Sequence, residues 1–259
     1  MQVTFLGTGT SQGVPMIHQP PGLIDLNDGR NWRTRTSVHV EVDGFRVQVD
    51  AAPEFRLQCI TCDIPSIDMF ILTHGHADHV LGMDDLRRFC DLRGGEAMPV
   101  YSTDEGLARI RSIFPYAVRD KAAVKGYPAF QLHNMPSCFE NEVVRIQSFS
   151  LPHGPLDVLG LVFTERSTGK NFAYFTDCHE LTPPALEAAA GCNLLVLDGL
   201  RENPHPSHMT IEEARLNAER VNPGMTYFVH MASTVDHART EAGLPSSVRL
   251  AFDGLTVRI

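Results

Sequence analysis

The chain has 259 residues, of which 43% are hydrophobic and 20% are charged, and its formal net charge is −9. This balance is typical of a folded globular protein and excludes a disordered or fibrous chain. The acidic charge also argues against a protein that clamps a long nucleic acid, because such binding depends on many Lys and Arg side chains on one face.

The N-terminal segment and the cysteines indicate the cellular compartment in which we expect the protein. The N-terminus lacks a basic region followed by an apolar stretch, and no apolar run is long enough to span a bilayer. We therefore expect no membrane association and a cytoplasmic location. The six cysteines lack the spacing of a small disulfide framework, so we expect reduced thiols. Cys59 and Cys62 are spaced like a redox pair, but we favour a buried turn of helix.

Apolar segments alternate with helical patterns and turn signals along the chain. We expect one domain over residues 1–259, of mixed α/β type with two sheets. The irregular stretches 17–36 and 114–142 could flank a cleft. Thr210 and Glu213 have the spacing of a capping box at the start of a helix. The predicted strands are 2–6, 37–42, 45–50, 68–72, 143–151, 157–164, 171–176, 194–198, 225–229 and 255–259, and the predicted helices are 79–92, 103–113 and 210–221.

Four potential metal ligands stand within six residues directly after the apolar segment 69–72: His74, His76, Asp78 and His79. On an extended segment, side chains two residues apart point the same way, so His74 and His76 can bind one cation. Asp78 and His79 follow once the chain has turned, and face a second position. Imidazole and carboxylate suit zinc and related divalent metals. The alternative explanation is a solvated, histidine-rich loop.

Three further candidates follow apolar runs later in the chain. His153 comes after the alternating segment 143–151, Asp177 after 171–176, and His230 after 225–229. Loops at the ends of strands gather functional groups in sheet-based folds. A single histidine in such a place is more often an ordinary core or surface residue, but three candidates that follow a four-ligand run indicate a metal site.

The His-x-His-x-Asp-His run with its later single ligands resembles the signature of the metallo-β-lactamase superfamily, over nearly the whole chain. The opening segment 3–15 and the segment 47–53 resemble in particular the branch with RNase Z and the cyclic phosphodiesterase PhnP. The resemblance implies a four-layer αββα sandwich with a dinuclear metal cleft at one edge. It also implies that His74, His76 and His153 hold one metal, that Asp78, His79 and His230 hold the other, and that Asp177 bridges them.

The resemblance implies a metal-dependent hydrolase in which a hydroxide bridging two cations attacks the substrate. We expect zinc, with manganese or iron as alternatives. A phosphodiester has a poor leaving group, so a proton donor should assist. His208 is our candidate, because the PhnP-like branch carries a catalytic histidine in this segment; His205 competes with it, and either could simply be a residue at a helix entry. We also assign Asp78 a catalytic role and Ser11, in the glycine-rich turn 7–13, a substrate contact together with His208.

Two more carboxylates end predicted strands. The resemblance places Asp50 where a carboxylate orients a metal-bound histidine; from local sequence alone, an aspartate that starts a turn before Pro53 is an equal alternative. Asp198 could act in the same way or face the substrate. His18, His39, His133, His179 and His237 receive no ligand role, although Thr234 and His237 lie near enough to His230 in sequence to line a pocket.

The chain also departs from its relatives. PhnP-type sequences carry cysteines for a structural zinc after the Gly-Val-Pro motif, but residues 16–22 contain none, so we expect no third metal. No basic insertion resembles the tRNA-binding arm of RNase Z, and we expect Cys178 to be packed away. We therefore expect a small anionic phosphodiester substrate, such as a 2′,3′-cyclic nucleotide or a ribose cyclic phosphate, and a possible homodimer. The alternatives are a ribonuclease, a lactone or thioester hydrolase, or a binding protein like the relative in coenzyme PQQ synthesis.

Overall fold

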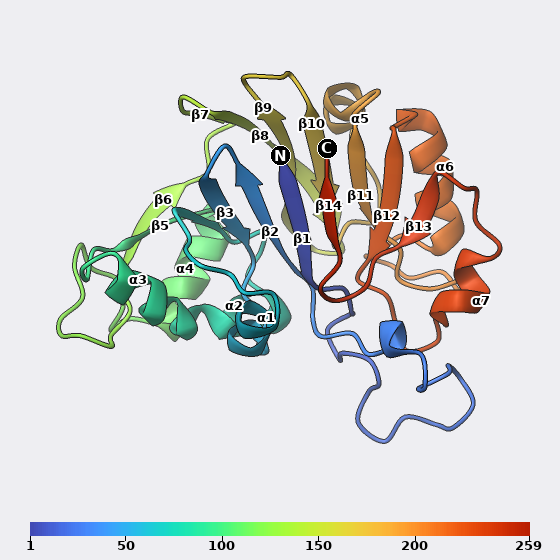
Figure 1. Ribbon diagram of the computed structural model, residues 1–259, viewed down its shortest axis with the longest axis horizontal. Helices are drawn as coiled ribbons and strands as arrows, with labels where there is room; N and C mark the ends of the chain where they lie inside the picture. The colour runs from blue at the N-terminus through green and yellow to red at the C-terminus, as the bar shows by residue number, and fades with distance from the viewer.

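The computed structural model describes residues 1–259 and contains two seven-stranded sheets. In hydrogen-bonded order, the strands of the first sheet are β14 (Thr256–Arg258), β1 (Gln2–Gly7), β2 (Ser37–Val42), β3 (Phe45–Val49), β4 (Met69–Ile71), β5 (Met98–Ser102) and β6 (Phe130–Asn134). The strands from β14 to β3 pair antiparallel, and those from β3 to β6 pair in parallel. The first and last strands of the chain are thus neighbours, and the two termini lie side by side (Figure 1).

The second sheet repeats this division into an antiparallel and a parallel half. In hydrogen-bonded order, its strands are β13 (Val248–Leu250), β12 (Met225–Val229), β11 (Leu194–Asp198), β10 (Asn171–Phe175), β9 (Leu156–Glu165), β8 (Val144–His153) and β7 (Cys138–Glu140). The strands from β7 to β10 pair antiparallel, and those from β10 to β13 pair in parallel. Parallel strands place their carboxyl ends at one edge, which is where functional loops collect in α/β proteins.

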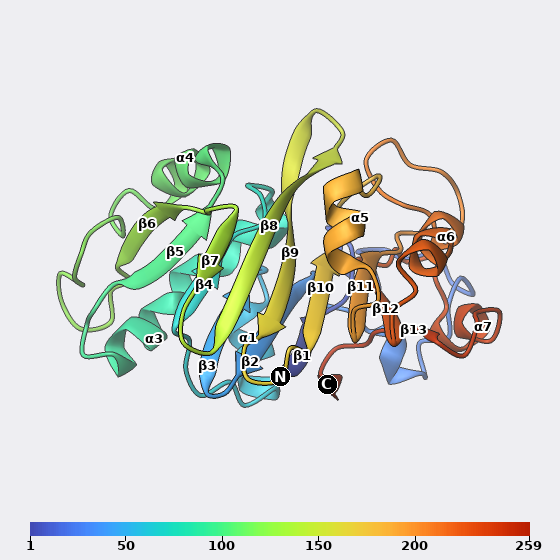
Figure 2. The same ribbon diagram turned by 90° about the horizontal axis from the view of Figure 1, so that it is seen from above.

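Helices cover the outer face of each sheet, so the layers follow the expected αββα order. They are α1 (Phe55–Thr61), α2 (Ala77–Val80), α3 (Arg87–Leu92), α4 (Asp104–Ile113), α5 (Pro183–Ala189), α6 (Ile211–Val221) and α7 (His237–Glu241), with 3₁₀ turns η1 (Gly29–Asn31) and η2 (Leu81–Leu86). Figure 2 shows α3 and α4 on one side of the two sheets and α5, α6 and α7 on the other. No helix has the length and apolar character needed to cross a bilayer.

Three apolar clusters hold these layers together. Alternate side chains of the two sheets meet between them, among them Val40, Phe163 and Val196. A second cluster packs α1 to α4 against the first sheet, and a third packs α5 and α6 against the second. Each buried Val, Leu or Phe side chain contributes roughly 1.5–3 kcal/mol to folding. Because apolar side chains fill the space between the layers, the polar side chains lie mainly at the edges of the sheets.

The start of α6 has the predicted capping box. The Thr210 hydroxyl accepts from the backbone N–H of Glu213 at 3.1 Å, and the Glu213 carboxylate accepts from the backbone N–H of Thr210 at 2.7 Å. Two N–H groups that have no partner within the helix are thereby satisfied. Because Thr210 follows His208 by two residues, this cap also fixes the chain next to His208.

The prediction of one helix over residues 79–92 is wrong. The segment is divided into α2, η2 and α3, because Gly82 sits directly against the backbone of residues 51 and 52. Its N–H donates to the Ala51 carbonyl at 2.9 Å, and a side chain there would meet the Ala52 carbonyl oxygen at 1.9 Å. This contact redirects the chain just after the histidine-rich run.

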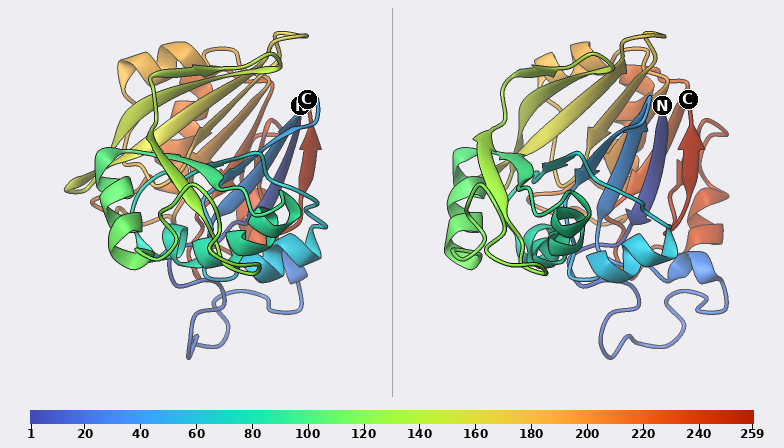
Figure 3. Two further views of the ribbon diagram at one scale, coloured as in Figure 1. Left: turned by 90° about the vertical axis from the view of Figure 1, so that its left-hand side faces the viewer. Right: turned by 60° about the vertical axis from the view of Figure 1, so that its left-hand side comes forward.

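Several elements were not predicted. The stretch 114–142 is not irregular throughout, since it contains β6 and β7, and β5 and β13 were also missed. β6 and β7 are edge strands of only five and three residues, too short for their pattern to stand out from the turn residues around them. The stretch 17–36 consists of turns around η1, as expected, and extends away from the sheets (Figures 1 and 3).

The cysteines behave as expected from composition. All six are free thiols, and Cys178 is buried. Cys59 lies in α1 and Cys62 at its end, both only partly buried. The predicted turn of helix is present, but it is less buried than expected; burial still raises the pKa of both thiols.

We predict that Gly82→Ala lowers the free energy of unfolding by about 1–3 kcal/mol, because the added methyl group must displace backbone. Gly29→Ala is the matched control, since a Cβ there meets nothing within 4 Å. Urea unfolding followed by circular dichroism measures both variants. Equal stability of the two would show that the close contact at Gly82 does not constrain the chain.

Candidate metal centre and adjoining pocket

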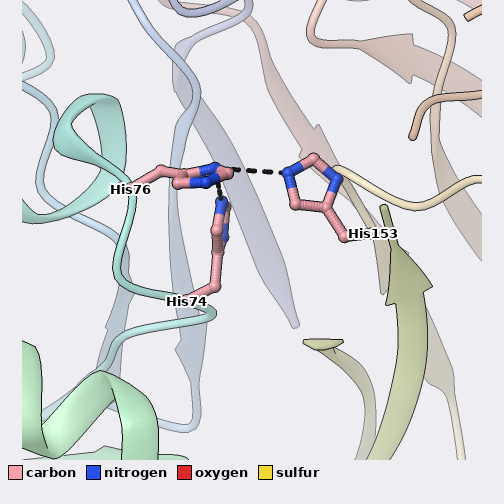
Figure 4. A group of neighbouring side chains, drawn as sticks. All are labelled: His74, His76 and His153. Atoms are coloured by element: carbon pink, nitrogen blue, oxygen red, sulfur yellow. Dashed lines mark hydrogen bonds between the residues drawn. The ribbon is translucent and has the colours of Figure 1, made fainter. Parts of the chain in front are cut away.

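Three imidazoles converge at one edge of the sandwich, as Figure 4 shows. The Nε2 atoms of His74 and His153 lie 2.9 and 3.2 Å from the Nδ1 atom of His76. His74 and His76 come from the loop after β4, and His153 ends β8. The Nδ1 atom of His153 lies 3.1 Å from the Ser207 carbonyl oxygen, to which it donates; its Nε2 lone pair then faces the other two rings. This is the first of the two ligand groups that the sequence predicted.

The second group lies next to the first and is deeply buried: Asp78, His79, Asp177 and His230. The Nε2 atom of His79 lies 3.2 Å from a carboxylate oxygen of Asp78 and 3.2 Å from one of Asp177. His230 directly follows β12, and its Nδ1 atom lies 3.2 Å from the other oxygen of Asp177. Asp177 therefore contacts both histidines of this group.

Asp50 orients the second group from behind. Its carboxylate accepts from His79 Nδ1 at 2.7 Å, from the Thr73 backbone N–H at 2.8 Å and from the Thr73 hydroxyl at 2.8 Å. The hydrogen bond fixes the proton of His79 on Nδ1 and leaves the Nε2 lone pair pointing into the group. The predicted contact of Asp50 with a ligand histidine is thus present in the structure.

The donor set fits a cation. The buried Nε2 atom of His79 has no hydrogen-bond partner, although two carboxylate oxygens lie 3.2 Å away. A lone pair that faces two anionic oxygens is repelled unless a proton or a metal ion lies between them. His, Asp and bridging carboxylate are common ligands of divalent metals. We conclude that these residues are suited to hold metal in two adjacent positions.

The pKa values of the imidazoles shift in different directions, and they differ even within the second group. Burial lowers the pKa of His74 and of His153, and it lowers the pKa of His230 to about 4, so these rings are neutral near pH 7, the form that binds metals. Burial alone would also lower the pKa of His79, but the carboxylates of Asp177, Asp78 and Asp50 outweigh it and hold this pKa well above its usual range.

The backbone is in an uncommon conformation at three residues of this centre. Asp50, Asp177 and His230 have positive φ angles of 61°, 55° and 59°. Side chains other than glycine seldom adopt this left-handed region, and such residues cluster at functional sites where the surroundings hold them. The conformation turns each of these side chains back towards the metal centre at the end of its strand.

His208 lies against both ligand groups. Its ring stacks on His230 with centroids 4.9 Å apart and an angle of 9°, and meets His153 edge to face at 4.8 Å. Its Nδ1 atom lies 2.6 Å from a carboxylate oxygen of the buried Asp198. Burial alone would lower the pKa of His208, but this carboxylate reverses the effect and raises it. His208 also lies close enough to His153 and Asp177 to share a cation with them, which the sequence did not predict.

A pocket of about 350 Å³ opens beside His208. Ser11 and Thr234 line it, as predicted, and His205 lies on its wall with its ring 4.9 Å from that of His208. His237 does not line it; this side chain is buried against Phe252. The residues that the sequence did not single out are Gln12, Met16, Leu200, Arg201, Ala232 and Ser233.

The turn that forms one wall of this pocket is anchored from the far end of the chain. Asp253 accepts from the Thr8 hydroxyl at 2.8 Å, and from the Thr34 backbone N–H and hydroxyl at 2.7 and 2.6 Å. The backbone of residues 8 and 10 pairs with Met231, next to His230. The glycine-rich turn is therefore tied to both the metal centre and the C-terminal segment.

A second pocket of about 570 Å³ adjoins the metal centre at His74 and His76. Arg109 from α4 packs over Gly75 between these two histidines, and Glu105 and Asp157 also line the space. The metal centre is thus open on two sides, and His76 itself is exposed.

A family model described as "Beta-lactamase superfamily domain" matches residues 45–231, which is most of the chain. The chain belongs to this superfamily. A solved structure of "a New Diphosphatase from the PhnP Family" is 31% identical, with a TM-score of 0.89 over 100% of this chain and 97% of that one. The chain therefore falls in the RNase Z and PhnP-like branch of the metallo-β-lactamase hydrolases, and its His and Asp groups have the composition and spacing to hold a metal ion.

Two more solved structures share the fold at lower identity. Zinc-bound PqqB from Methylobacterium extorquens has a TM-score of 0.79 at 22% identity, and covers 100% of both chains. Human tRNase Z, short form, has a TM-score of 0.74 at 17% identity, over 100% of this chain and 99% of that one. These two similarities support the fold of the chain and say nothing about its activity.

The curated relatives have different names. "Octanoyltransferase" from Porphyromonas gingivalis is 32% identical over 262 residues, which cover 98% of this chain but 51% of that protein. The chain thus spans about half the length of this relative. "Coenzyme PQQ synthesis protein B" from Rhodopseudomonas palustris is 24% identical over 231 residues, which cover 77% of this chain and 73% of that protein.

We predict that Asp50→Asn lowers metal affinity by about 10- to 100-fold, because the amide no longer provides the charged acceptor that orients His79. Competition with a chromophoric chelator measures the affinity. Asp120→Asn, at an exposed position, is the control for the change in charge. An unchanged affinity in Asp50→Asn would show that His79 needs no orientation.

Proposed function

We propose that the protein is a dinuclear metal-dependent hydrolase of small phosphodiesters, such as 2′,3′-cyclic nucleotides or ribose cyclic phosphates. The observation that carries the proposal is the position of His208, which contacts a histidine of each ligand group and also lines the adjoining pocket. A substrate whose phosphoryl group lies at the metal centre would have its leaving group next to this side chain.

In this proposal, His74, His76 and His153 hold one cation, Asp78, His79 and His230 hold the other, and Asp177 contacts both. When bound, a pair of divalent cations supplies a nucleophilic water near neutral pH and neutralises charge on the attacked phosphoryl group. Zinc is our first choice, since imidazole suits it and the PqqB structure is zinc-bound, and manganese or iron are alternatives.

The side chains divide the remaining work. A bond forms from the water oxygen to phosphorus, and the bond from phosphorus to the leaving oxygen breaks. One proton of the water passes to solvent and the other stays on the phosphate product. His208 donates a proton from Nε2 to the leaving oxygen, while its Nδ1–H stays hydrogen-bonded to Asp198. Asp78 orients the attacking water, and Ser11 contacts the substrate from the mouth of the pocket. His205 is the competing proton donor, but it lacks a carboxylate partner and is less buried.

Cleavage of a diphosphate is the second candidate. The relative that is 31% identical over the whole chain is called a diphosphatase, and the same side chains would serve a phosphoric anhydride. The two reactions differ in their need for a proton, since a phosphate leaves more easily than an alkoxide. Dependence on His208 therefore distinguishes them.

Other activities have less support. A ribonuclease that grips tRNA needs a basic surface, which a net charge of −9 does not favour. The name octanoyltransferase belongs to a relative of which this chain matches about half the length, so it carries no activity to this chain. If the proposal fails, the remaining alternatives are a thioester or lactone hydrolase and a PqqB-like binding protein.

We predict that zinc-loaded protein binds two metal ions per chain, and that His153→Ala binds one fewer, since it loses a ligand nitrogen. Mass spectrometry of the metal content gives the numbers. His133→Ala is the control, because this histidine stacks on Tyr101 away from the metal centre. One metal in the unchanged protein would contradict the dinuclear proposal.

We predict that His208→Ala lowers kcat for 2′,3′-cyclic AMP by roughly 10²–10⁴-fold with metal content retained. The loss should be much smaller for bis(4-nitrophenyl) phosphate, whose nitrophenolate leaves without a proton. His205→Ala is the control and should lose less on both substrates. An equal loss on the two substrates would indicate a role other than proton donation.

Metal-loaded protein that hydrolyses diphosphates but no diester would favour the second candidate. Protein that binds two metals and hydrolyses neither would overturn the proposal, and would direct the search to carbonyl esters or to a binding role.

A further inference from the structure

The loop 17–36 extends away from the sheets, but its last six residues are held close to the metal centre (Figure 3). We call residues 31–36 the anchor segment. Its polar side chains Asn31, Arg33 and Thr36 are buried, with exposed fractions of 0%, 2% and 1%. Polar side chains are seldom buried so completely unless hydrogen bonds satisfy them. The partners of these three side chains therefore show what the anchor segment holds.

Thr36 contacts the ligand His230 directly. The Thr36 hydroxyl donates to the Gly9 carbonyl at 2.9 Å and lies 3.1 Å from His230 Nδ1. Because the hydroxyl proton is directed at Gly9, its oxygen can only accept from the imidazole, so the ring proton is on Nδ1. Asp177 Oδ1, 3.2 Å from the same nitrogen, is a second acceptor for this proton. The lone pair of the neutral ring is then on Nε2, which is free to bind a cation.

The other two side chains hold the chain a few residues beyond this ligand. The Asn31 oxygen accepts from the His237 backbone N–H at 2.8 Å, and the Asn31 nitrogen donates to the Asp236 carboxylate at 3.1 Å. Arg33 Nη2 donates to the Asn31 oxygen at 3.0 Å, and Arg33 Nη1 donates to the Val235 carbonyl at 2.8 Å. Residues 235–237 are thereby fixed by the anchor segment.

The turn between these two attachments forms part of the wall of the pocket of about 350 Å³, which residues 232–234 line. The Val235 backbone N–H donates to the Ala232 carbonyl at 3.0 Å and closes the turn. The side chain of Gln19, also from the loop, donates to the Ser233 carbonyl at 3.1 Å. The loop therefore holds the ligand before this turn, the turn itself and the residues after it.

The burial of Arg33 has a free-energy cost. Its Nε has no hydrogen-bond partner, and burial lowers the pKa of its guanidinium to about 10. Apolar side chains of similar volume would stabilise a core at least as well, so a buried charge is better explained by the groups that it holds in place. Residues 16–22 contain no cysteine that could bind a structural zinc. Buried hydrogen bonds are what orders the loop here.

We propose that Thr36 is a positioning residue for His230 in the second metal position. Asn31 and Arg33 hold the turn that follows, so that no structural metal ion is needed there. The inference rests on the proposed dinuclear function and adds the element that orients this histidine. The first metal position differs, because His153 is oriented by a backbone carbonyl outside the anchor segment.

The test isolates one metal position before the anchor segment is changed. In a His153→Ala background, the second position is the one left complete, and competition with a chromophoric chelator measures its zinc affinity. Thr36→Val keeps the shape of the side chain but removes the hydroxyl, and we expect zinc affinity to fall by about 10- to 100-fold. Thr36→Ser keeps the hydroxyl and should retain the affinity.

The complementary background separates positioning from a general loss of structure. In His230→Ala, the first position is the one left complete, and Thr36→Val should leave its zinc affinity unchanged. An equal loss of affinity in the two backgrounds would indicate a role in folding alone, and would overturn the inference.

Trp32 reports on the loop without any need for metal. It is the only tryptophan of the chain, and its indole N–H donates to the Leu26 carbonyl within the loop. Asn31→Ala should shift its fluorescence and speed proteolysis of the loop. Asn27→Ala is the matched control, since its side chain contacts only Asp25 in the same loop. Removal of metal by a chelator should leave the fluorescence of the unchanged protein as it was; a shift would show that a metal ion orders the loop, against the inference.

The two proposals fail in different ways. Unchanged protein that binds fewer than two zinc ions contradicts the proposed function and the inference with it. Unchanged protein that binds two, together with full affinity of Thr36→Val at the second position, leaves the function in place and overturns the inference about Thr36.

Discussion

The structure depends on giving a partner to each of the carboxylates that are buried at one edge of the sandwich. Asp50, Asp78, Asp177 and Asp198 are all buried at one edge of the sandwich. An isolated buried carboxylate is too costly to keep, so each must face a hydrogen-bond donor or a cation. Each faces an imidazole here, and the imidazoles in turn face one another. The positions of the loops follow from this requirement, because a displaced loop would leave a charge uncompensated.

The sequence predicted the candidate site residues that lie in a short motif or at the end of an apolar run. The run from His74 to His79 is visible in six residues, and His153, Asp177 and His230 each come at the end of an apolar run, of which only 143–151 alternates. The sequence pointed to Asp198 and to His208 separately, but it did not predict that their side chains form a hydrogen bond. Arg201 was missed, because a single arginine in a polar loop has no pattern until the fold places it beside His208.

The errors in the fold have the same origin. The helical pattern of residues 79–92 is real, but the close approach of Gly82 to the backbone at Ala51 and Ala52 overrides it. That contact joins segments about thirty residues apart, and no local propensity describes it. β6 and β7 were missed because they have only five and three residues, too few for alternation to stand out in a region rich in turn residues. The expected αββα layers were nevertheless correct, since the interior strands stand out as apolar runs that are buried on both faces.

The contacts of Asp253 have a consequence for the order of folding. The glycine-rich turn near the N-terminus takes its position from a carboxylate 245 residues later, and β1 receives its outer neighbour only from β14. Contacts between residues so far apart in sequence form late in folding, because closing a long loop costs conformational entropy. During synthesis, the helices and hairpins in the middle of the chain can assemble while this turn still lacks its anchor. The wall of the pocket is therefore among the last parts of the molecule to become ordered.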